Sequence, residues 1–197
     1  FVSTGSRAAY NFDRKIHVKQ AEELTANLWF GMDMNVDYMT AVLGCSYSDG
    51  SIHYFDEIRQ SNSNTEQLAI AMKKIAPGIS VYPDATGSAR STTSNKSDHQ
   101  ILRDHGFNVI AKKVNPPIID RINALNRMLQ DANGKIRMTV DPKCTYLIKD
   151  LEQVQRSRDG KIDKTKDISL THALDACSYY IALKYPVVQR LVTSSQW

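Results

Sequence analysis

The sequence predicts an α/β domain: a mixed sheet of five strands or slightly more, with helices on both faces and a small hairpin insertion. Three observations support this fold class. Residues 28–58 contain three apolar or alternating runs joined by short polar turns, the pattern of an antiparallel meander. From residue 65 onward, segments with apolar residues at helical spacing alternate with short apolar runs. Strands separated by helices generally run parallel, so the later strands are expected to be parallel.

The meander begins after a polar segment. Residues 28–34 form a short apolar run with aromatic side chains, which is typical of a buried strand. A second strand is expected over residues 39–47 and a third over residues 52–58, joined by the turn signal at residues 48–51. Such short connections allow only antiparallel neighbours.

Helices and strands alternate in the rest of the chain. Ser63 or Asn64 can cap a helix over residues 65–76, which Pro77 and Gly78 end. The next elements are expected in this order: a strand at 79–82, a loop at 85–96, a helix at 97–105, a strand at 107–111, a helix at 117–131, a strand at 135–140 and a helix at 143–155. The charged segment 156–167 predicts a hairpin or mobile loop before a final helix at 169–184.

Polar residues at each end bound the expected domain. Residues 1–26 are expected to be a lead-in from an upstream domain, because the chain begins with Phe1 rather than Met. The domain itself is expected to span residues 27–186, followed by a tail at residues 187–197.

Composition and charge are those of an ordinary globular protein. Of the 197 residues, 42% are hydrophobic and 23% are charged, and the formal net charge is +4. This mildly basic balance permits a nucleic-acid partner without establishing one. Cys45, Cys144 and Cys177 are widely separated and form no CxxC pair, which argues against a disulfide framework and a structural zinc site and suits a reducing cytoplasm. The apolar runs are too short for a membrane span, and no P-loop motif is present.

Three aspartates fall at positions that solubility does not explain. Asp33 is expected inside the first strand, Asp84 follows the fourth strand, and Asp175 lies on an otherwise apolar helix. Burying an ionised carboxylate is costly unless a cation meets it. A hard cation such as Mg²⁺ or Mn²⁺, which prefers oxygen ligands, would account for all three together.

Each aspartate also has a simpler interpretation. Asp84 precedes Ala-Thr-Gly and can be a turn-former or a cap. Asp175 can be an exposed helix residue or the partner of a lysine or arginine. Asp33 has no cation among its sequence neighbours, so a simple interpretation is hardest to find for this residue.

Three motifs in this order resemble the nuclease domain of tailed-phage large terminases, a branch of the ribonuclease H-like superfamily. They are GMDMNVDYMT at residues 31–40, YPDATG at residues 82–87 and THALDA at residues 171–176. Residues 10–18, YNFDRKIHV, resemble the segment that joins the ATPase domain of these enzymes to the nuclease. The resemblance spans nearly the whole chain and implies a ribonuclease H-like fold.

The resemblance also implies a function. The three matching acids, Asp33, Asp84 and Asp175, would hold two Mg²⁺ or Mn²⁺ ions that cleave concatemeric double-stranded DNA, with Asp33 as the bridging ligand. The partners would be double-stranded DNA and, in the full protein, an ATPase domain, the small terminase subunit and the portal. Such a complex acts in the host cytoplasm and is not retained in the mature virion.

Other polar residues could assist this site. His172 precedes Asp175 by one helical turn, so it could contact the scissile phosphate, orient Asp175 or simply pack. Asp37 could be a further ligand or a turn residue between the first two strands. Asp98 and His99 could act in catalysis or merely open a helix.

DNA contacts are expected from cations near the acids, because phosphate neutralisation dominates affinity. The candidates are Arg90, Lys96, Lys112, Lys113, Arg156 and Arg158, with Lys161 and Lys164 on the same charged segment as the last two. Lys112 and Lys113 are favoured, because they form a strand-end pair without local acids. The charged segment can instead be a solvated surface loop.

Two other functions remain open on the sequence alone. The chain could be another ribonuclease H-like enzyme, such as a junction resolvase or a transposase-like enzyme, which would show structure-selective cutting. It could also be a non-catalytic module that docks DNA or a portal, with the acids binding structural ions. A plasmid-nicking assay in Mn²⁺ separates the second possibility from both enzymes.

Overall fold

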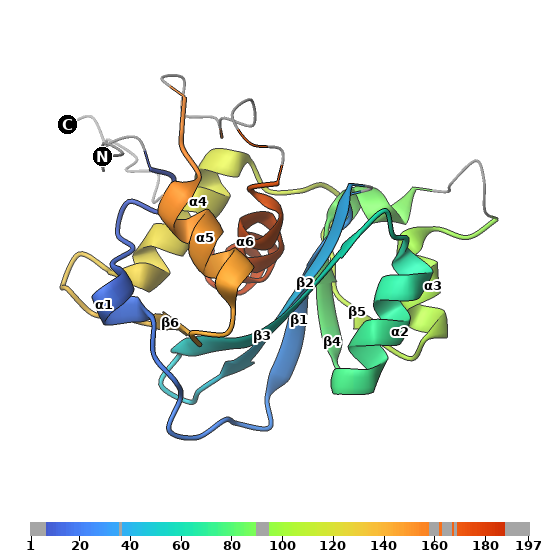
Figure 1. The fold of residues 1–197 in the computed structure, drawn as a ribbon, viewed down its shortest axis with the longest axis horizontal. Coiled ribbons are helices and arrows are strands. Elements are labelled where there is room, and N and C mark those ends of the chain that lie inside the picture. The colour runs from blue at the N-terminus through green and yellow to red at the C-terminus, as the bar shows by residue number, and fades with distance from the viewer. Residues whose placement is uncertain are drawn as a thin grey trace, which may run out of the picture.

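The computed structural model describes residues 7–35, 37–89, 95–157, 162, 167 and 169–187. Within these residues a six-stranded mixed sheet carries helices on both faces (Figure 1), which confirms the expected fold class. The strands are β1 (Leu28–Asp33), β2 (Tyr38–Ser46), β3 (Ile52–Ser61), β4 (Ser80–Pro83), β5 (Asn108–Val109) and β6 (Met138–Val140). Their order across the sheet is β5-β4-β1-β2-β3-β6.

The pairing of the strands follows their connections. β1, β2 and β3 form the antiparallel meander, in which Leu28 pairs with Cys45 and Asp33 with Thr40. β4 pairs in parallel with β1, β5 with β4, and β6 with β3. The long connections to these parallel strands contain the helices. The end of β1 therefore lies next to the end of β4 at one edge of the sheet.

Helices cover the two faces unequally. They are α1 (Arg14–His17), α2 (Thr65–Ile75), α3 (Asp98–Asp104), α4 (Ile118–Leu129), α5 (Thr145–Gln153) and α6 (His172–Lys184), and a short 3₁₀ helix, η2 (Ala85–Ser88), follows β4. α2 and α3 lie on one face, whereas α1, α4, α5 and α6 lie on the other (Figure 1). None of the helices in the described ranges has the length and apolar character of a membrane span.

The core consists of two apolar clusters, one on each face of the sheet. Trp29 belongs to the larger cluster beneath α4, α5 and α6, and its neighbour Phe30 belongs to the smaller cluster beneath α2 and α3. Successive residues of a strand point to opposite faces, so β1 contributes to both clusters in turn. This is why β1 is almost entirely buried and why its sequence is continuously apolar rather than alternating.

Several expected boundaries differ from the structure, among them the third strand, β5, β6 and α5, and two of the differences lie next to the acids. Asp33 was expected inside the first strand but is its last residue. The final helix begins at His172 rather than at residue 169, because Thr171 has a φ of 86° and so cannot continue a right-handed helix.

The two ends of the described fold also bear on the predicted lead-in and hairpin. Ala8, Ala9 and Phe12 are buried in the larger cluster, so this part of residues 1–26 packs against the domain. The domain boundaries at residues 26 and 186 stay a prediction. In the charged segment, Arg156 and Ile162 form an antiparallel bridge, as a hairpin requires, and residues 158–161 and 163–166 lie outside the described residues.

Candidate metal centre

Asp33 and Asp84 occupy the same edge of the sheet. Asp33 ends β1, and Asp84 directly follows β4, the parallel neighbour of β1. The backbone N–H of Asp84 donates to the carbonyl of Met32 at 3.2 Å, so the parallel ladder continues up to the two acids. The carboxyl ends of neighbouring parallel strands are where α/β sheets commonly build sites.

A close contact between β1 and α6 brings the third acid to this edge. A Cβ at Gly31 would collide with the backbone carbonyl of Ala176, so the helix approaches the strand as closely as a glycine allows. Two strand residues and one helical turn both span about 6 Å. From the contact at Gly31, Asp33 is therefore level with His172, one turn before Ala176. Asp175 lies on the same part of α6.

His172 contacts Asp33 across this gap. Its Nδ1 lies 2.9 Å from Asp33 Oδ2, and both side chains are buried. The ring of Tyr38 packs beside the imidazole, with 5.6 Å between ring centroids. From the sequence, Asp175 is the expected neighbour of His172 on the helix, whereas the contact with Asp33 joins residues that are 139 positions apart in the chain.

Asp175 forms a buried ion pair with Arg121 of α4. Arg121 Nη1 donates to Asp175 Oδ1 at 2.8 Å, and the two side chains are only 7% and 5% exposed. The same nitrogen donates to Ser178 Oγ at 2.7 Å. Of the simpler interpretations, the ion-pair partner is therefore confirmed for Asp175 and the exposed helix residue is wrong.

Asp84 is held by donors from three segments. Its Oδ1 accepts hydrogen bonds from Asn115 Nδ2 at 2.7 Å and from the N–H and hydroxyl of Thr86, while its Oδ2 accepts from Tyr179 Oη at 2.8 Å. Burial raises the pKa of Asp84, but the hydrogen bonds from Asn115, Thr86 and Tyr179 outweigh it and leave the pKa below its ordinary value. Asp84 also caps η2, so its interpretation as a cap is confirmed.

Tyr179 of α6 donates a hydrogen bond to Asp84 and lies within electrostatic range of Asp33 and Asp175. It follows Asp175 by four residues, and Asp175 follows His172 by three, so all three side chains share one face of α6. Burial raises the pKa of Tyr179 far above its ordinary value, and the negative charges of Asp175, Asp33 and Asp84 raise it further, against the effect of Arg121. Its hydroxyl therefore stays protonated and donates to Asp84.

The donor chemistry of this edge fits a hard divalent cation. β1, the end of β4 and α6 each contribute one carboxylate whose charge acts on the Tyr179 hydroxyl, and carboxylate oxygens are the ligands that Mg²⁺ and Mn²⁺ prefer. Their present positions are set by protein donors instead. Among the residues that the structure describes, no three acidic, histidine or cysteine side chains are close enough to hold one metal ion.

Another buried acid fixes the start of α6. Asp150 of α5 is 2% exposed, and its Oδ2 accepts the N–H groups of Ala173 and Leu174 at 2.9 and 3.0 Å. It replaces the side-chain cap that Thr171 does not provide. Burial raises the pKa of Asp150 from 3.8 to about 6, although the helix N–H groups oppose the shift.

Four residues that contact the acids or position α6 were not predicted from the sequence: Arg121, Asn115, Tyr179 and Asp150. Arg121 and Asp150 do carry a signal, because a charged residue on the apolar stripe of an amphipathic helix indicates a buried partner. Asn115 precedes two prolines in a loop, and Tyr179 sits in an apolar helix, so neither position points to Asp84.

The DNA-binding candidates are spread over several surfaces. Lys112 and Lys113 are exposed in the loop after β5, and Lys112 lines a small hollow together with Asn115 and Tyr179. Lys96 is exposed and pairs with Asp104 of α3. Arg156 lies 5.8 Å above the ring of Tyr10.

The other cationic candidates, Arg90, Arg158, Lys161 and Lys164, fall outside the described residues. Of the candidates that the structure describes, Lys112 is thus the one placed beside groups that contact Asp84.

Three candidates remain, and each forms a hydrogen bond with a nearby protein group: Asp37, Asp98 and His99. Asp37 is exposed at the bend between β1 and β2, in keeping with a turn role, and its N–H donates to Asn35 Oδ1 at 2.9 Å. His99 is buried near the start of α3, with its Nε2 2.8 Å from the carbonyl oxygen of Asp84. Asp98 accepts a hydrogen bond from Thr65 of α2. His99 thus holds the backbone of Asp84.

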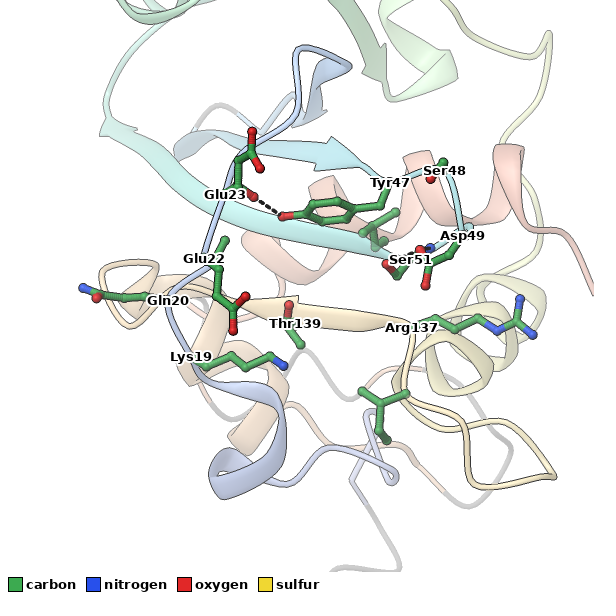
Figure 2. A pocket seen from close by; sticks show the side chains of 13 residues that line it. Lys19, Gln20, Glu22, Glu23, Tyr47, Ser48, Asp49, Ser51, Arg137 and Thr139 are labelled. Carbon is green, nitrogen blue, oxygen red and sulfur yellow. Dashed lines mark hydrogen bonds between the residues drawn. The ribbon is translucent and has the colours of Figure 1, made fainter.

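One hollow in the described structure lies away from these acids. It has a volume of about 560 Å³ and is lined by Lys19, Glu22, Tyr47, Asp49 and Arg137 among others (Figure 2). The hydroxyl of Tyr47 donates to the carbonyl of Glu23 at 2.8 Å across it. Because Tyr47 follows the far end of β2, this hollow is at the opposite end of the sheet from Asp33.

Comparison with known proteins identifies the family. The model of the terminase RNase H-like domain matches residues 30–184, so the chain belongs to this family. The P22 large terminase nuclease domain is similar in structure, with a TM-score of 0.71 and 18% sequence identity, covering 93% of this chain and 96% of that chain. No curated protein sequence matches the chain significantly.

A second solved structure is the g2p (large terminase) nuclease domain from the bacteriophage SPP1 with bound Mn. It matches with a TM-score of 0.52 and 16% identity, covering 83% of this chain and 94% of that chain. The yeast mitochondrial Holliday junction resolvase matches less well, with a TM-score of 0.41 and 11% identity. At these identities, the two terminase structures establish that the fold is shared.

Proposed function

We propose that this chain is the metal-dependent DNA endonuclease domain of a viral packaging terminase and cleaves concatemeric double-stranded DNA by two-metal phosphodiester hydrolysis. One observation carries the proposal. In a chain of the terminase RNase H-like family, Asp33 and Asp84 lie at adjacent parallel strand ends and Asp175 lies on the helix packed against them. Neither a solvated surface nor a packed core needs three carboxylates at such a place.

Asp33, Asp84 and Asp175 are the residues that would hold two Mg²⁺ or Mn²⁺ ions. When bound, such ions activate a water molecule and stabilise the leaving oxygen of a phosphodiester. The manganese named with the SPP1 nuclease structure supports this choice of cation. Asp33, at the end of the central strand β1, is the proposed bridging ligand.

The protein itself would supply an ionised ligand, orient a second ligand and neutralise the phosphates of DNA. The lowered pKa of Asp84 keeps this carboxylate ionised at neutral pH, as a metal ligand must be. His172 fixes the orientation of Asp33 through the 2.9 Å contact. The exposed pair Lys112 and Lys113 would neutralise DNA phosphates near Asp84, while Lys96 and Arg156 would contact DNA farther away.

The proposal includes the setting of the reaction. We assign the nuclease domain to residues 27–186, with residues 1–26 as the lead-in and residues 187–197 as a tail. In the full protein we expect an ATPase domain, the small terminase subunit and the portal as partners. The reaction would take place in the host cytoplasm, within a packaging complex that is not retained in the mature virion.

The test is nicking of supercoiled plasmid by the purified chain in Mn²⁺. Asp33→Asn is expected to reduce the nicking rate by at least about a hundredfold, because an amide cannot supply the negative charge that a bridging ligand needs. Asp49→Asn is the matched control, since it makes the same change in an exposed turn at the far end of the sheet. Its rate should equal that of the parent.

Three results would count against the proposal. Undiminished nicking by Asp33→Asn would show that the assigned carboxylate is not a metal ligand. Absence of nicking in a parent that still binds Mn²⁺ would favour the non-catalytic DNA or portal module. A strong preference for four-way junctions over linear duplex DNA would favour a junction resolvase.

A further inference from the structure

Arg121 is a buried cation that pairs with one of the three acids, Asp175. It lies in the second half of the first turn of α4, is 6% exposed, and reaches α6 with a single nitrogen. That nitrogen, Nη1, donates to Asp175 at 2.8 Å and to Ser178 at 2.7 Å. The guanidinium carbon lies 4.6 Å from the ring centroid of Tyr179, whose hydroxyl donates to Asp84.

This arginine is incompletely satisfied. Its Nε is buried and has no hydrogen-bond partner in the structure. A guanidinium that serves as a permanent structural partner of a carboxylate commonly binds it through two nitrogens. Arg121 instead shares one nitrogen between a carboxylate and a hydroxyl, so it can release Asp175 and still keep Ser178 and the face of Tyr179.

A guanidinium and a divalent cation cannot both bind Asp175 at full strength. Two positive charges a few ångströms apart repel strongly in a buried site. The carboxylate oxygen that accepts from Arg121 is one of only two oxygens that Asp175 can offer to a metal. Metal bound at Asp175 therefore has to displace the arginine or tolerate its charge.

We propose that Arg121 is an internal counter-ion that occupies Asp175 while metal is absent and keeps the metal affinity of the site low. The inference rests on the proposed function, because it takes Asp175 to be a metal ligand. It adds a regulatory device. Without metal, the acids stay paired with protein groups, and an interaction that moves Arg121 away from Asp175 and toward Ser178 frees Asp175 to bind metal. The phosphates of bound DNA are a chemical group that could do so.

The test compares Mn²⁺ binding by Arg121→Gln and by Arg127→Gln, using calorimetry on the full chain. Arg127 lies on the same helix but is exposed, so both variants lose one positive charge and only one loses the ion pair. Arg121→Gln is expected to bind Mn²⁺ roughly tenfold more tightly than the parent. Arg127→Gln should leave the affinity within about twofold of the parent.

Thermal unfolding provides a second measurement. In EDTA, Arg121→Gln is expected to unfold at a lower temperature than the parent, because Asp175 is left buried without its cation. Saturating Mn²⁺ should restore much of this loss and raise the midpoint of the variant more than that of the parent. A variant that folds only in Mn²⁺ supports the inference.

If Arg121→Gln is unfolded even in Mn²⁺, the Mn²⁺ affinity of Ser178→Ala tests the inference in its place. It removes the other acceptor of Arg121 and is expected to weaken Mn²⁺ binding about threefold, because the arginine then depends more on Asp175. Unchanged or tighter binding by Ser178→Ala would overturn the inference. Unchanged or weaker Mn²⁺ binding by a folded Arg121→Gln would overturn it as well and make Arg121 a positioning residue.

Asp33→Asn separates this inference from the proposed function. If neither the parent nor Arg121→Gln binds Mn²⁺, or if Asp33→Asn binds it as well as the parent, the proposed function fails and the inference fails with it. If Mn²⁺ binding depends on Asp33 but does not tighten in Arg121→Gln, only the inference fails.

Discussion

The two halves of α6 are held in place by different forces. The N-terminal half carries His172 and Asp175, and each contacts a charged group on another element, Asp33 or Arg121. The C-terminal half carries Tyr180, which stacks on Trp29 with 3.3 Å between ring centroids and 7° between ring planes. The first half thus depends on matched pairs, and the second depends on buried aromatic area.

This difference separates stability from chemistry within one helix. Apolar packing tolerates small displacements, whereas a buried charge needs its partner within hydrogen-bond distance. Anchoring the C-terminal half firmly allows the N-terminal half to pair with an incompletely satisfied group, Arg121 of α4. Changes in the two halves should therefore have different consequences, in the following order of size.

The largest effect on stability is expected from Trp29→Ala. The indole is 2% exposed, stacks on Tyr180, makes edge contacts with Tyr54 and Tyr82, and donates to Ser46 Oγ at 2.8 Å. Its loss should lower the free energy of unfolding by about 3–5 kcal/mol, as measured by urea denaturation. Trp29→Phe keeps part of the ring area and should recover part of this loss. A loss below about 1 kcal/mol for the alanine variant would contradict an aromatic anchor.

Asp150→Asn tests the N-terminal half through the pH dependence of stability. The pKa of Asp150 is raised by burial from 3.8 to about 6, so the folded state binds its proton more tightly than the unfolded state. The stability that this group contributes is complete below about pH 4 and is lost as the pH rises through 6. Over that window, the parent should lose about 3 kcal/mol relative to Asp150→Asn.

Urea denaturation of both proteins between pH 4 and pH 7 checks this prediction. Asparagine keeps an oxygen that can accept from the N–H groups of Ala173 and Leu174, so the variant should fold. The difference between the two free energies of unfolding should shift in favour of the variant as the pH rises. A difference that stays constant across the range would show that Asp150 has an ordinary pKa.

A smaller effect on stability is expected from Gly31→Ala, where the two halves of α6 meet. The added Cβ meets the carbonyl of Ala176, which is backbone and cannot rotate away, so strand and helix must separate slightly. The free energy of unfolding should fall by about 1–3 kcal/mol. Nicking in Mn²⁺ should fall further than this loss of stability explains, because Asp33 moves away from α6. Parent-like nicking would mean that the close approach is not needed for the site.

Much of the local structure could be predicted from the sequence. Asn64 caps α2 and forms a reciprocal capping box with Gln67, which confirms one of the two expected caps. The three strands of the meander and the order of the later helices follow from the spacing of apolar residues, which reports which face of an element is buried. The three aspartates could be singled out in the same way, since they interrupt buried patterns. Their assignment as metal ligands stays a prediction.

Only the tertiary structure decided which groups meet. Arg121 and Asp175 are 54 residues apart, and His172 and Asp33 are 139 residues apart, so no local pattern connects them. Periodicity indicates that a residue faces inward, but its partner depends on how closely two elements dock. Here the docking is set by Gly31 beneath Ala176, a contact that exists only once β1 and α6 have packed together. The sequence by itself determined where the acids stand along the chain, and packing determined the cations that meet them.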